Sequence, residues 1–483
     1  MSAHGESPGG MNAQGESPGG MSAELVTQVL RASLEFLDRQ MLLAPSVNEQ
    51  IGFDFQGFRR SYEDDPAHPD ARFVARFGRV WIYDVALSIY ADLKSGRLRQ
   101  AGYQVGRVMQ LALREKERGF QGLWHFSYNS QGDLFIDARG PAGANAWCLN
   151  AVYAYILATG NMTPLAWANR AVQEFLFPLQ VLDPQDPRCG LVRAGLYNAD
   201  DLARGEAMGY QVYGGDLNHR YEHVILEHNA DAAGTFRLAH RATRRFSPEG
   251  SGSFLEELAH RHDLLMQGIR RSFWQGDHFI SAVDPQGRPY LGTDGLPSIA
   301  VDNNTWAAHA FLPYDPDVAA AAIRYVEEKF LTRAPPAQIE DLPQAVDLPE
   351  LKGLYYFPAT FMDPFVLVAD EDRAKMEKLF SPEAALGFVL FLKDAGQQAR
   401  AWELFEQTMR LTRLYGSGGA PYASANVPKI FTTLHSVTTA ATCAITAAVL
   451  KGESSDDFLG VLPPREFAVA GKPPRTAVLT PTR

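Results

Sequence analysis

Helical segments of two kinds alternate along most of this 483-residue chain. Segments of the first kind are rich in alanine and aromatic residues and carry few charges, so they are apolar around nearly the whole helix. Segments of the second kind are amphipathic, with charged residues along one side. A helix that is apolar all round must be covered by protein, whereas an amphipathic helix can cover it and still face water. The alternation therefore predicts two concentric layers of helices.

The apolar starts are spaced irregularly, roughly 50–80 residues apart, which favours a closed ring over an open stack of short repeats. Glycines stand where four of the helices are expected to end, at Gly96, Gly160, Gly396 and Gly452. We therefore predict an all-α fold, an (α/α)6 toroid of about twelve helices with short β-hairpins in the loops, two of them near 124–132 and 278–287. The predicted helices cover 22–43, 79–94, 98–117, 144–159, 163–179, 222–243, 253–273, 302–312, 316–330, 382–394, 397–413 and 435–451.

Both ends of the chain are predicted to lie outside this fold. Residues 1–21 contain two similar decapeptides rich in Gly, Ser and Pro, a composition that cannot bury enough apolar surface to become ordered. Residues 453–483 are rich in proline and are expected to form an extended tail. Residues 22–452 would then form one toroidal catalytic domain.

Composition excludes several classes of protein. The net charge is −11 and no Lys/Arg block occurs, which argues against binding to nucleic acid or to an anionic membrane surface. No apolar span is long enough to cross a membrane and no signal-peptide core stands at the N-terminus, so a cytoplasmic location is expected. The sequence predicts neither the oligomeric state nor the role of the decapeptide repeat.

The three cysteines, Cys148, Cys189 and Cys443, show no CxxC or Cys/His ligand spacing. A disulfide framework and a structural zinc site are therefore not expected. No glycine-rich phosphate-binding motif follows a strand either. We predict no cofactor and no metal.

The stretch Arg220–Leu238 combines acidic and imidazole side chains with an otherwise apolar helix. His223, Glu227 and Asp231 stand four residues apart and share one helical face. Buried carboxylates cost several kcal/mol unless they are paired or hydrogen-bonded. The face is therefore either a satisfied network in the core or a polar cluster that lines a cleft.

Other apolar helices also carry polar and aromatic residues near their N-terminal ends. If all these ends open on one side of the ring, the polar and aromatic residues at the helix starts converge on one funnel. Individually, Asn145 and Asn303 are also ordinary helix caps, and Trp147 or Trp306 is also an ordinary core residue. The candidates are Tyr83, Asp84, Asn145, Trp147, Glu227, His228, Asn229, Asp231, Asp302, Asn303 and Trp306.

Helices that begin Tyr83-Asp84, Gly143-Ala-Asn-Ala-Trp147, Glu227-His-Asn229 and Asp302-Asn-Asn-Thr-Trp306 resemble the six-hairpin glycosidase superfamily. The resemblance spans roughly residues 70–450. It implies that carbohydrate binds in a funnel at the N-termini of the inner helices. Many of these enzymes hydrolyse glycosidic bonds with inversion, using a Glu acid and an Asp or Glu base, whereas others are sugar epimerases or polysaccharide lyases built on His and Tyr.

On this basis the chain is expected to be an inverting glycoside hydrolase that acts on an oligo- or polysaccharide. Glu227 is the predicted general acid, because apolar neighbours and nearby Asp231 would favour its protonated form. Asp302 or Asp84 is the predicted base, while Asp231 would orient the acid; Asp363 and Glu383 are weaker candidates. Sugar rings and hydroxyls would be bound by a further set of side chains, namely Tyr83, Asn145, Trp147, His228, Asn229, Asp231, Asn303 and Trp306.

Two other functions fit the same pattern. A sugar epimerase or isomerase would use His223, His228 or His435 as a base near neutral pH. A non-catalytic toroid would bind a glycan or a partner protein without turnover. Replacing Glu227 with Gln separates hydrolysis from simple binding, because only a hydrolase would lose turnover while it keeps its ligand.

Overall fold

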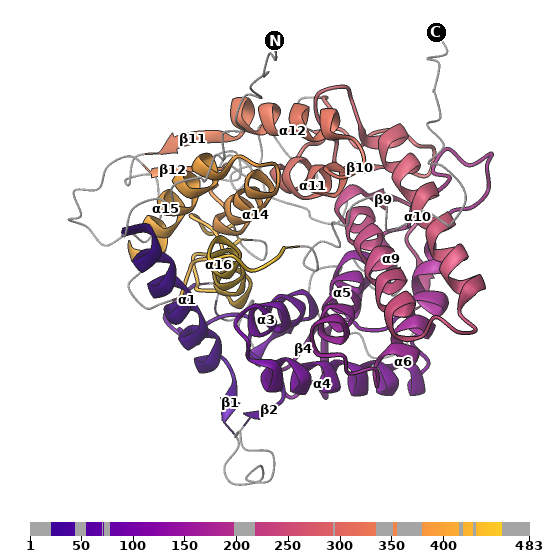
Figure 1. Cartoon of the computed structure of the whole chain (residues 1–483), viewed down its shortest axis with the longest axis horizontal. Coiled ribbons are helices and arrows are strands. Elements are labelled where there is room, and N and C mark those ends of the chain that lie inside the picture. Colours follow the sequence, from indigo (N-terminus) through magenta and orange to yellow (C-terminus); the bar gives the residue numbers. More distant parts are fainter. Residues whose placement is uncertain are drawn as a thin grey trace, which may run out of the picture.

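Two concentric rings of helices surround a common axis in the computed structural model (Figure 1). The structure describes residues 21–43, 55–69, 71, 78–197, 218–292, 295–334, 351–354, 379–414, 419–427 and 431–455. The decapeptide repeat, most of the predicted C-terminal tail and the candidate Asp363 lie outside these residues. No helix in the described part of the chain is long and apolar enough to cross a membrane.

The inner ring is closed, because each inner helix contacts the next one in the chain and the last contacts the first. Its helices are buried on nearly every side; in α16, for example, every residue from Val437 to Leu450 is buried. In chain order the described inner helices are α3 (Ile82–Lys94), α5 (Ala142–Thr159), α9 (Leu226–Phe246), the π-helical turn η3 (Asn303–Ala307) continued by α11 (Ala308–Phe311), α14 (Pro382–Asp394) and α16 (Val437–Leu450).

The outer ring contains the amphipathic helices, each packed against an inner helix. In α4 the buried residues recur every three or four positions, as expected for a helix with one covered face. The outer helices are α1 (Met21–Arg39), α4 (Leu98–Glu117), α6 (Leu165–Ala171) continued by η2 (Val172–Leu176) and α7 (Phe177–Leu179), α10 (Gly252–Phe273), α12 (Pro316–Lys329) and α15 (Gln398–Leu414). The predicted (α/α)6 toroid is confirmed.

Some helix boundaries differ from those predicted. The first helix ends at Arg39, because Leu42–Leu43 (β1) forms an antiparallel pair with Phe55–Gln56 (β2). The segment predicted as one helix over 163–179 contains the π-helical turn η2, shortly before Pro178. Proline has no amide hydrogen and its ring crowds the carbonyl four residues back, so a regular helix cannot continue through it. All four glycines predicted to end helices have positive φ, for example 71° at Gly160.

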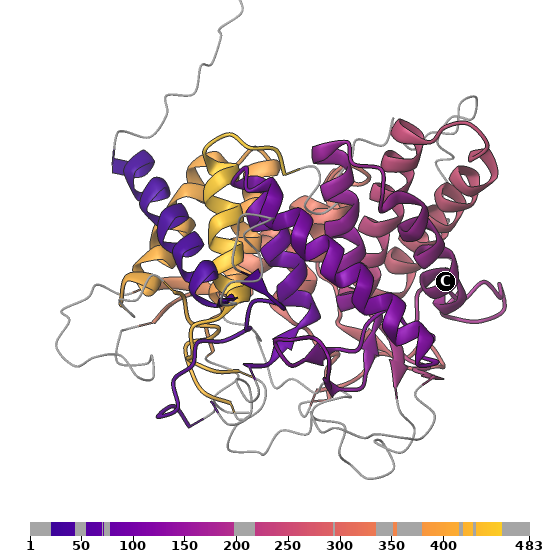
Figure 2. The ribbon, with the colours of Figure 1, turned by 90° about the horizontal axis from the view of Figure 1, so that it is seen from below.

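Short strands gather at one end of the ring, the lower end in Figure 2. The hairpin predicted near 124–132 is present, with Ser127 opposite Asp137 across β4 and β5. Near 278–287 the predicted turn forms and the chain folds back through an antiparallel bridge between Val283 and Pro289, while the strand Ala282–Val283 also pairs with Val224–Ile225. The other strands are β3 (Val80–Trp81), β4 (Ser127–Tyr128), β5 (Phe135–Asp137), β6 (Gly140–Pro141), β7 (Gly195–Tyr197), β8 (His219–Arg220), β9 (Val224–Ile225), β10 (Ala282–Val283), β11 (Leu331–Ala334) and β12 (Leu351–Leu354).

Candidate active site

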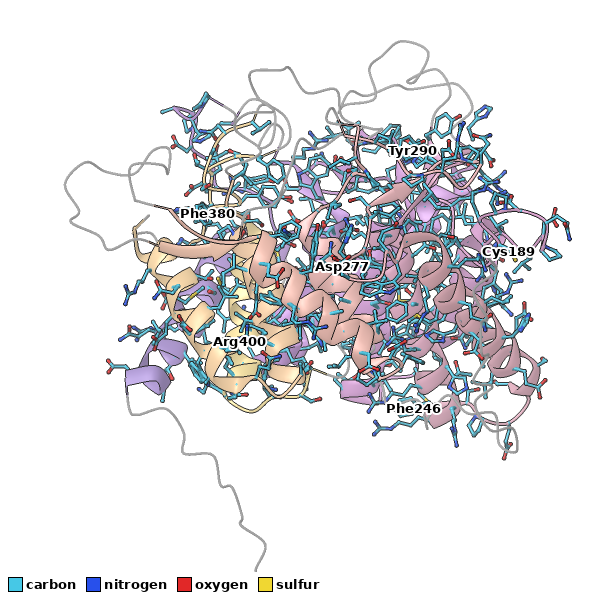
Figure 3. All side chains as sticks on the ribbon, turned by 90° about the horizontal axis from the view of Figure 1, so that it is seen from above. Cys189, Phe246, Asp277, Tyr290, Phe380 and Arg400 are labelled. Atoms are coloured by element: carbon cyan, nitrogen blue, oxygen red, sulfur yellow. The ribbon has the colours of Figure 1, made fainter. Side chains whose placement is uncertain are left out.

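The inner helices begin at the end of the ring that carries the strands. Figure 3 shows Phe380, which shortly precedes α14, on the same side as Tyr290, which follows β10. Phe246, the last residue of α9, lies at the opposite end. The polar residues at the starts of the inner helices therefore share one end of the molecule, as the sequence predicts.

A repeated pattern of exposure marks this end. Tyr83, Glu227, Asp302, Trp306 and Glu383 are each partly exposed, although almost all the residues beside them in sequence are buried. They belong to α3, α9, η3 and α14 or stand directly before these elements. Partly exposed side chains at the starts of the inner helices are presented to a ligand that arrives from that end.

Tyr83 and Glu383 are in direct contact across the ring. The Tyr83 hydroxyl donates a short hydrogen bond to Oε1 of Glu383, which lies 300 positions later in the chain. Burial raises the pKa of Glu383 to about 8; the hydrogen bond from Tyr83 opposes this shift, whereas the charges of Asp84 and Asp302 add to it. The pKa of Tyr83 is raised well above its ordinary value by burial and by the Glu383 charge, so this phenol remains a donor.

Glu227 begins the first turn of α9, immediately after the β9–β10 pair. Its charge contributes to the raised pKa of Tyr83, after burial and Glu383. It also contributes to the raised pKa of Tyr422, for which burial and Glu383 are again larger causes. Glu227 and Glu383 therefore lie within electrostatic reach of the same two phenols, although they come from different helices.

Asp231 lies one turn after Glu227 and is held by two indoles. Its Oδ1 accepts a 3.0 Å hydrogen bond from Trp306 Nε1, and the Trp147 side chain also donates to its carboxyl group. Asp231 is only 3% exposed, and burial raises its pKa well above the usual range. Its Oδ2 has no hydrogen-bond partner in the described part of the chain. A Cβ at Gly143 would come within 2.9 Å of that oxygen, so glycine is needed there to make room.

Trp147 and Trp306 form an aromatic pair beside the carboxyl groups. Their ring centroids are 4.9 Å apart, and Tyr83 packs edge-on against Trp147 at 5.5 Å. Trp147 is almost fully buried, whereas Trp306 is partly exposed. Of the two, Trp306 is therefore the ring that a sugar could contact, and Trp147 supports it.

Asp302 precedes η3 and lies within electrostatic reach of two other carboxyl groups. Its Oδ1 accepts the backbone N–H of Asn303 at 2.7 Å. Burial is the largest cause of the raised pKa values of Asp231 and Glu383, and the charge of Asp302 adds to both, following that of Asp84 in the case of Glu383. The sequence-predicted Asp302 therefore joins Glu227, Asp231 and Glu383 in one cluster of carboxyl groups.

Asp84 lies below the surface of this cluster. It is 4% exposed and accepts hydrogen bonds from the hydroxyl groups of Thr438 and Ser61. Burial raises its pKa to about 7, and the two hydroxyl donors only partly oppose the shift. A carboxyl group with little solvent contact is poorly placed to position a water on a substrate.

The raised pKa of Asp84 predicts a pH-dependent effect of Asp84→Asn on stability. The folded chain binds this proton more tightly than the unfolded chain, so the favourable contribution is complete below about pH 4 and is lost as the pH rises towards 7. The neutral variant cannot ionise, so its stability relative to the natural chain should increase by on the order of 3 kcal/mol between about pH 4 and pH 8. Denaturant unfolding at the two pH values measures this difference; an equal difference at both would contradict it.

Three asparagines have the same structural role at the starts of inner helices. The amide of Asn145 bonds both the N–H and the carbonyl of Trp124, and Asn229 does the same with Val192. Asn304 bonds Phe279 in the same way. Each asparagine also donates to the carbonyl four residues before it in the chain. The side-chain amides of Asn145 and Asn229 therefore hold loops in place.

Loss of one of these amides should destabilise the fold. Asn229→Ala would leave the buried N–H and carbonyl of Val192 without partners and would remove three hydrogen bonds. Unsatisfied buried backbone groups cost about 1–3 kcal/mol each, so we expect a loss of about 2–4 kcal/mol. Denaturant unfolding tests this value, with the partly exposed Asn169→Ala as a control that loses only side-chain partners.

Asn303 differs from its neighbour Asn304. Its Nδ2 donates to the Ser281 hydroxyl at 2.9 Å, while its buried Oδ1 has no partner among the described residues. With 4% exposure it supports the loop beneath Asp302 more directly than it could contact a ligand.

His228 and His223 are uncharged at neutral pH. Burial lowers the pKa of His228 to about 3 and that of His223 to about 4. The His228 ring lies against Gly143 and bonds the backbone of Ala194. His435 is 5% exposed and pairs with Glu63, whose Oε2 lies 3.3 Å from its Nδ1.

Two members of the cluster were weak or absent in the sequence-based prediction. Glu383 ranked only as a reserve, because its partner Tyr83 is distant in sequence. Tyr422 was not predicted at all, since it lies in a loop and not at the start of a helix. Among the residues that the structure describes, no group of three or more His, Cys, Asp or Glu side chains is arranged to hold a metal ion.

No family model matches the sequence, and no curated protein sequence matches it. Solved structures do match over nearly the whole chain. A wild-type glycosidase is 12% identical and covers 92% of this chain and 100% of its own, with a TM-score of 0.54. A D-mannose isomerase is 12% identical over 91% of this chain and 100% of its own, with a TM-score of 0.55.

A cellobiose 2-epimerase from Spirochaeta thermophila is 13% identical and covers 90% of this chain and 98% of its own, with a TM-score of 0.51. At identities this low the comparison concerns the fold. The chain therefore shares the (α/α)6 toroid fold of these solved structures.

Proposed function

We propose that the protein is a carbohydrate-active enzyme, an inverting glycoside hydrolase that acts on an oligo- or polysaccharide. The observation that carries this proposal is the placement of Glu227 and Glu383. Both are partly exposed at the starts of separate inner helices, and both act electrostatically on Tyr83 and Tyr422. Two carboxyl groups that face each other across a sugar are the machinery that glycosidic hydrolysis requires.

In the proposed reaction Glu227 gives its proton to the glycosidic oxygen as the bond from that oxygen to the anomeric carbon breaks. Glu383 takes a proton from a water molecule whose oxygen attacks the anomeric carbon from the opposite face. The products are a free alcohol and a sugar of inverted anomeric configuration. No covalent intermediate on the protein is needed.

Tyr83 supports Glu383 as the base. Its hydroxyl occupies Oε1 and so fixes the carboxyl group, which leaves Oε2 to orient water. A pKa of about 8 also makes ionised Glu383 a stronger base than an ordinary carboxylate. Asp302 remains the alternative base because it is partly exposed in the same cluster, whereas buried Asp84 is not retained in that role.

Trp306 is the proposed sugar contact, and buried Asp231 holds its indole in place. The partly exposed face of Trp306 would pack against a pyranose ring. His228 would line the same region as a neutral group. In this proposal Asn145, Asn229 and Asn303 hold loops in place by hydrogen bonds and do not bind the sugar.

A sugar epimerase or isomerase is the second candidate, because an isomerase and an epimerase share the fold as closely as the glycosidase does. Such a reaction needs a base that removes a proton from carbon. Histidines with pKa values of about 3 and 4 are weak bases, so His228 and His223 favour hydrolysis over this alternative.

The direct test is proton NMR of the products from a panel of α- and β-linked glucans and oligosaccharides. Hydrolysis with inversion is expected to give new reducing ends whose first-formed anomer is opposite to that of the substrate. An unchanged degree of polymerisation with a new sugar epimer would instead establish the isomerase. Binding of a carbohydrate without any product would indicate that the protein is a non-catalytic, glycan-binding toroid.

The pKa of Glu383 also predicts the pH profile. Because the base must be ionised and the acid Glu227 protonated, kcat/KM should follow a bell-shaped pH profile with one limb whose midpoint lies near pH 8. Tyr83→Phe removes a donor that lowers this pKa, so the limb should move to higher pH. Profiles of both proteins from about pH 5 to pH 10 measure the shift. A limb that stays in place in the Tyr83 variant would remove Glu383 from the role of base.

A further inference from the structure

Arg237 is a fully buried cation in the middle of α9, with 0% of its surface exposed. Its Nε donates to the carbonyl of Ala233 in the same helix. Neither Nη1 nor Nη2 has a hydrogen-bond partner among the described residues. Guanidinium stays charged at all ordinary pH values, and burying it without acceptors is strongly unfavourable. Something with negative charge is therefore expected beside it.

The groups around Arg237 are donors or neutral rings. Its Cζ lies 5.4 Å from the ring centroid of Tyr314, which stands in the turn between α11 and α12. The Tyr314 hydroxyl is itself buried and has no partner in the described part of the chain. The face of the phenol offsets part of the positive charge, but it offers no acceptor to the terminal nitrogens.

His262 lies within electrostatic reach of this cation, and His240 lies within reach of His262. His262 on α10 is 0% exposed, with its ring centroid 5.4 Å from that of Tyr314, and His240 on α9 is 8% exposed. Burial lowers both pKa values to about 4, so neither ring is charged at neutral pH. Asp263, the acidic neighbour, has a side chain that is 69% exposed and therefore screened by water.

We propose that Arg237 and Tyr314 bind a small monovalent anion of the halide class, such as chloride, between α9, α10 and the α11–α12 turn. The guanidinium and the phenol hydroxyl supply N–H and O–H donors, which is the chemistry that an anion requires. Arg237 and His262 are fully buried and the Tyr314 ring packs 5.4 Å from each of them, so an ion bound there would have to be small, which favours a single-atom ion over an organic acid. The bound ion would fasten the α9–α10 hairpin that carries Glu227 at its other end.

Bromide is the probe, because it replaces chloride and scatters anomalously. Crystals of the full chain soaked in sodium bromide should show an anomalous peak within hydrogen-bond distance of Arg237 and Tyr314. In solution the melting temperature should rise by about 2 °C or more when chloride replaces gluconate at constant ionic strength. Tyr314→Phe removes one donor with little change in volume, so its chloride response should be clearly smaller.

The matched control is Tyr325→Phe, a partly exposed tyrosine on α12 that stacks on His278 and should leave the chloride response unchanged. Arg237→Met should abolish the response if that variant folds; the crystal experiment and the Tyr314 variant do not depend on it. A map without a peak at Arg237, together with equal chloride responses in the natural chain and Tyr314→Phe, would overturn the proposal. In that case ordinary water satisfies the guanidinium.

Discussion

Glu383→Gln and Glu227→Gln are each expected to lower kcat by about 100- to 10,000-fold while substrate binding is retained. Both substitutions keep the size of the side chain and remove only its ability to transfer a proton. In the Glu383→Gln variant Tyr83 can still donate to the carbonyl oxygen of the new side-chain amide, so the wall of the site should stay in place. Steady-state kinetics and ligand titration on the same preparations separate loss of chemistry from loss of binding.

Substrates with different leaving groups distinguish the two roles. An aryl glycoside with an acidic phenol needs little protonation, so the Glu227 variant should recover most of its activity on it, whereas the Glu383 variant should not. Glu256→Gln, an exposed glutamate on the outer helix α10, is the matched control and should change kcat by less than about twofold. If Asp302→Asn loses activity and Glu383→Gln does not, the base is Asp302. Full activity in both glutamate variants would exclude the proposed mechanism.

Asp92→Ala is expected to destabilise the chain by about 3–5 kcal/mol, because it would remove the buried carboxylate partner of Arg59 and leave that charge only the half-exposed Asp38, 3.7 Å away. Arg59 is 1% exposed and bonds both carboxyl oxygens of Asp92, at 2.8 and 3.2 Å. Its Nε also donates to the carbonyl of Leu37 near the end of α1. Arg59 thus fastens the first outer helix to α3, and α1 in turn packs on the last inner helix α16.

Chemical denaturation of the Asp92 variant measures this cost. Glu174→Ala, which breaks the exposed ion pair with Lys116 on the outer ring, should change the free energy of unfolding by less than about 1 kcal/mol. Equal small effects for the two variants would show that closure of the ring does not depend on the Arg59–Asp92 pair.

The sequence was sufficient to predict the fold, because the proportion and spacing of charged residues in each helix show how much of that helix is buried. The apolar stretch from Val437 to Leu450 has no charged residue and is buried throughout, whereas α4 shows the alternation of a half-covered helix. It also predicted that Tyr83, Trp147, Glu227, Asp231 and Trp306 are brought together. When all inner helices start at one end of a ring, residues at the same position from the start of each helix lie close together.

The sequence could not show which polar side chains are already hydrogen-bonded to the backbone. Asn145 and Asn229 looked like ligand contacts, yet the amides bond Trp124 and Val192. A signal was available, since Asn304 stands at a similar position in a third helix, and one residue type at equivalent positions favours a shared structural role. Glu383 could not be ranked above Asp84, because its contact with Tyr83 joins residues 300 positions apart and exists only after the ring closes.

The most direct measurement is a crystal structure of the Glu383→Gln variant with an uncleaved oligosaccharide bound. The account predicts that a glycosidic oxygen lies within hydrogen-bond distance of Glu227, with a water held by residue 383 on the opposite face of the sugar. The two side-chain carboxyl positions should be about 6.5–9.5 Å apart across the bond. A sugar bound away from the N-termini of α9 and α14, or the two side chains on the same face of the ring, would contradict it.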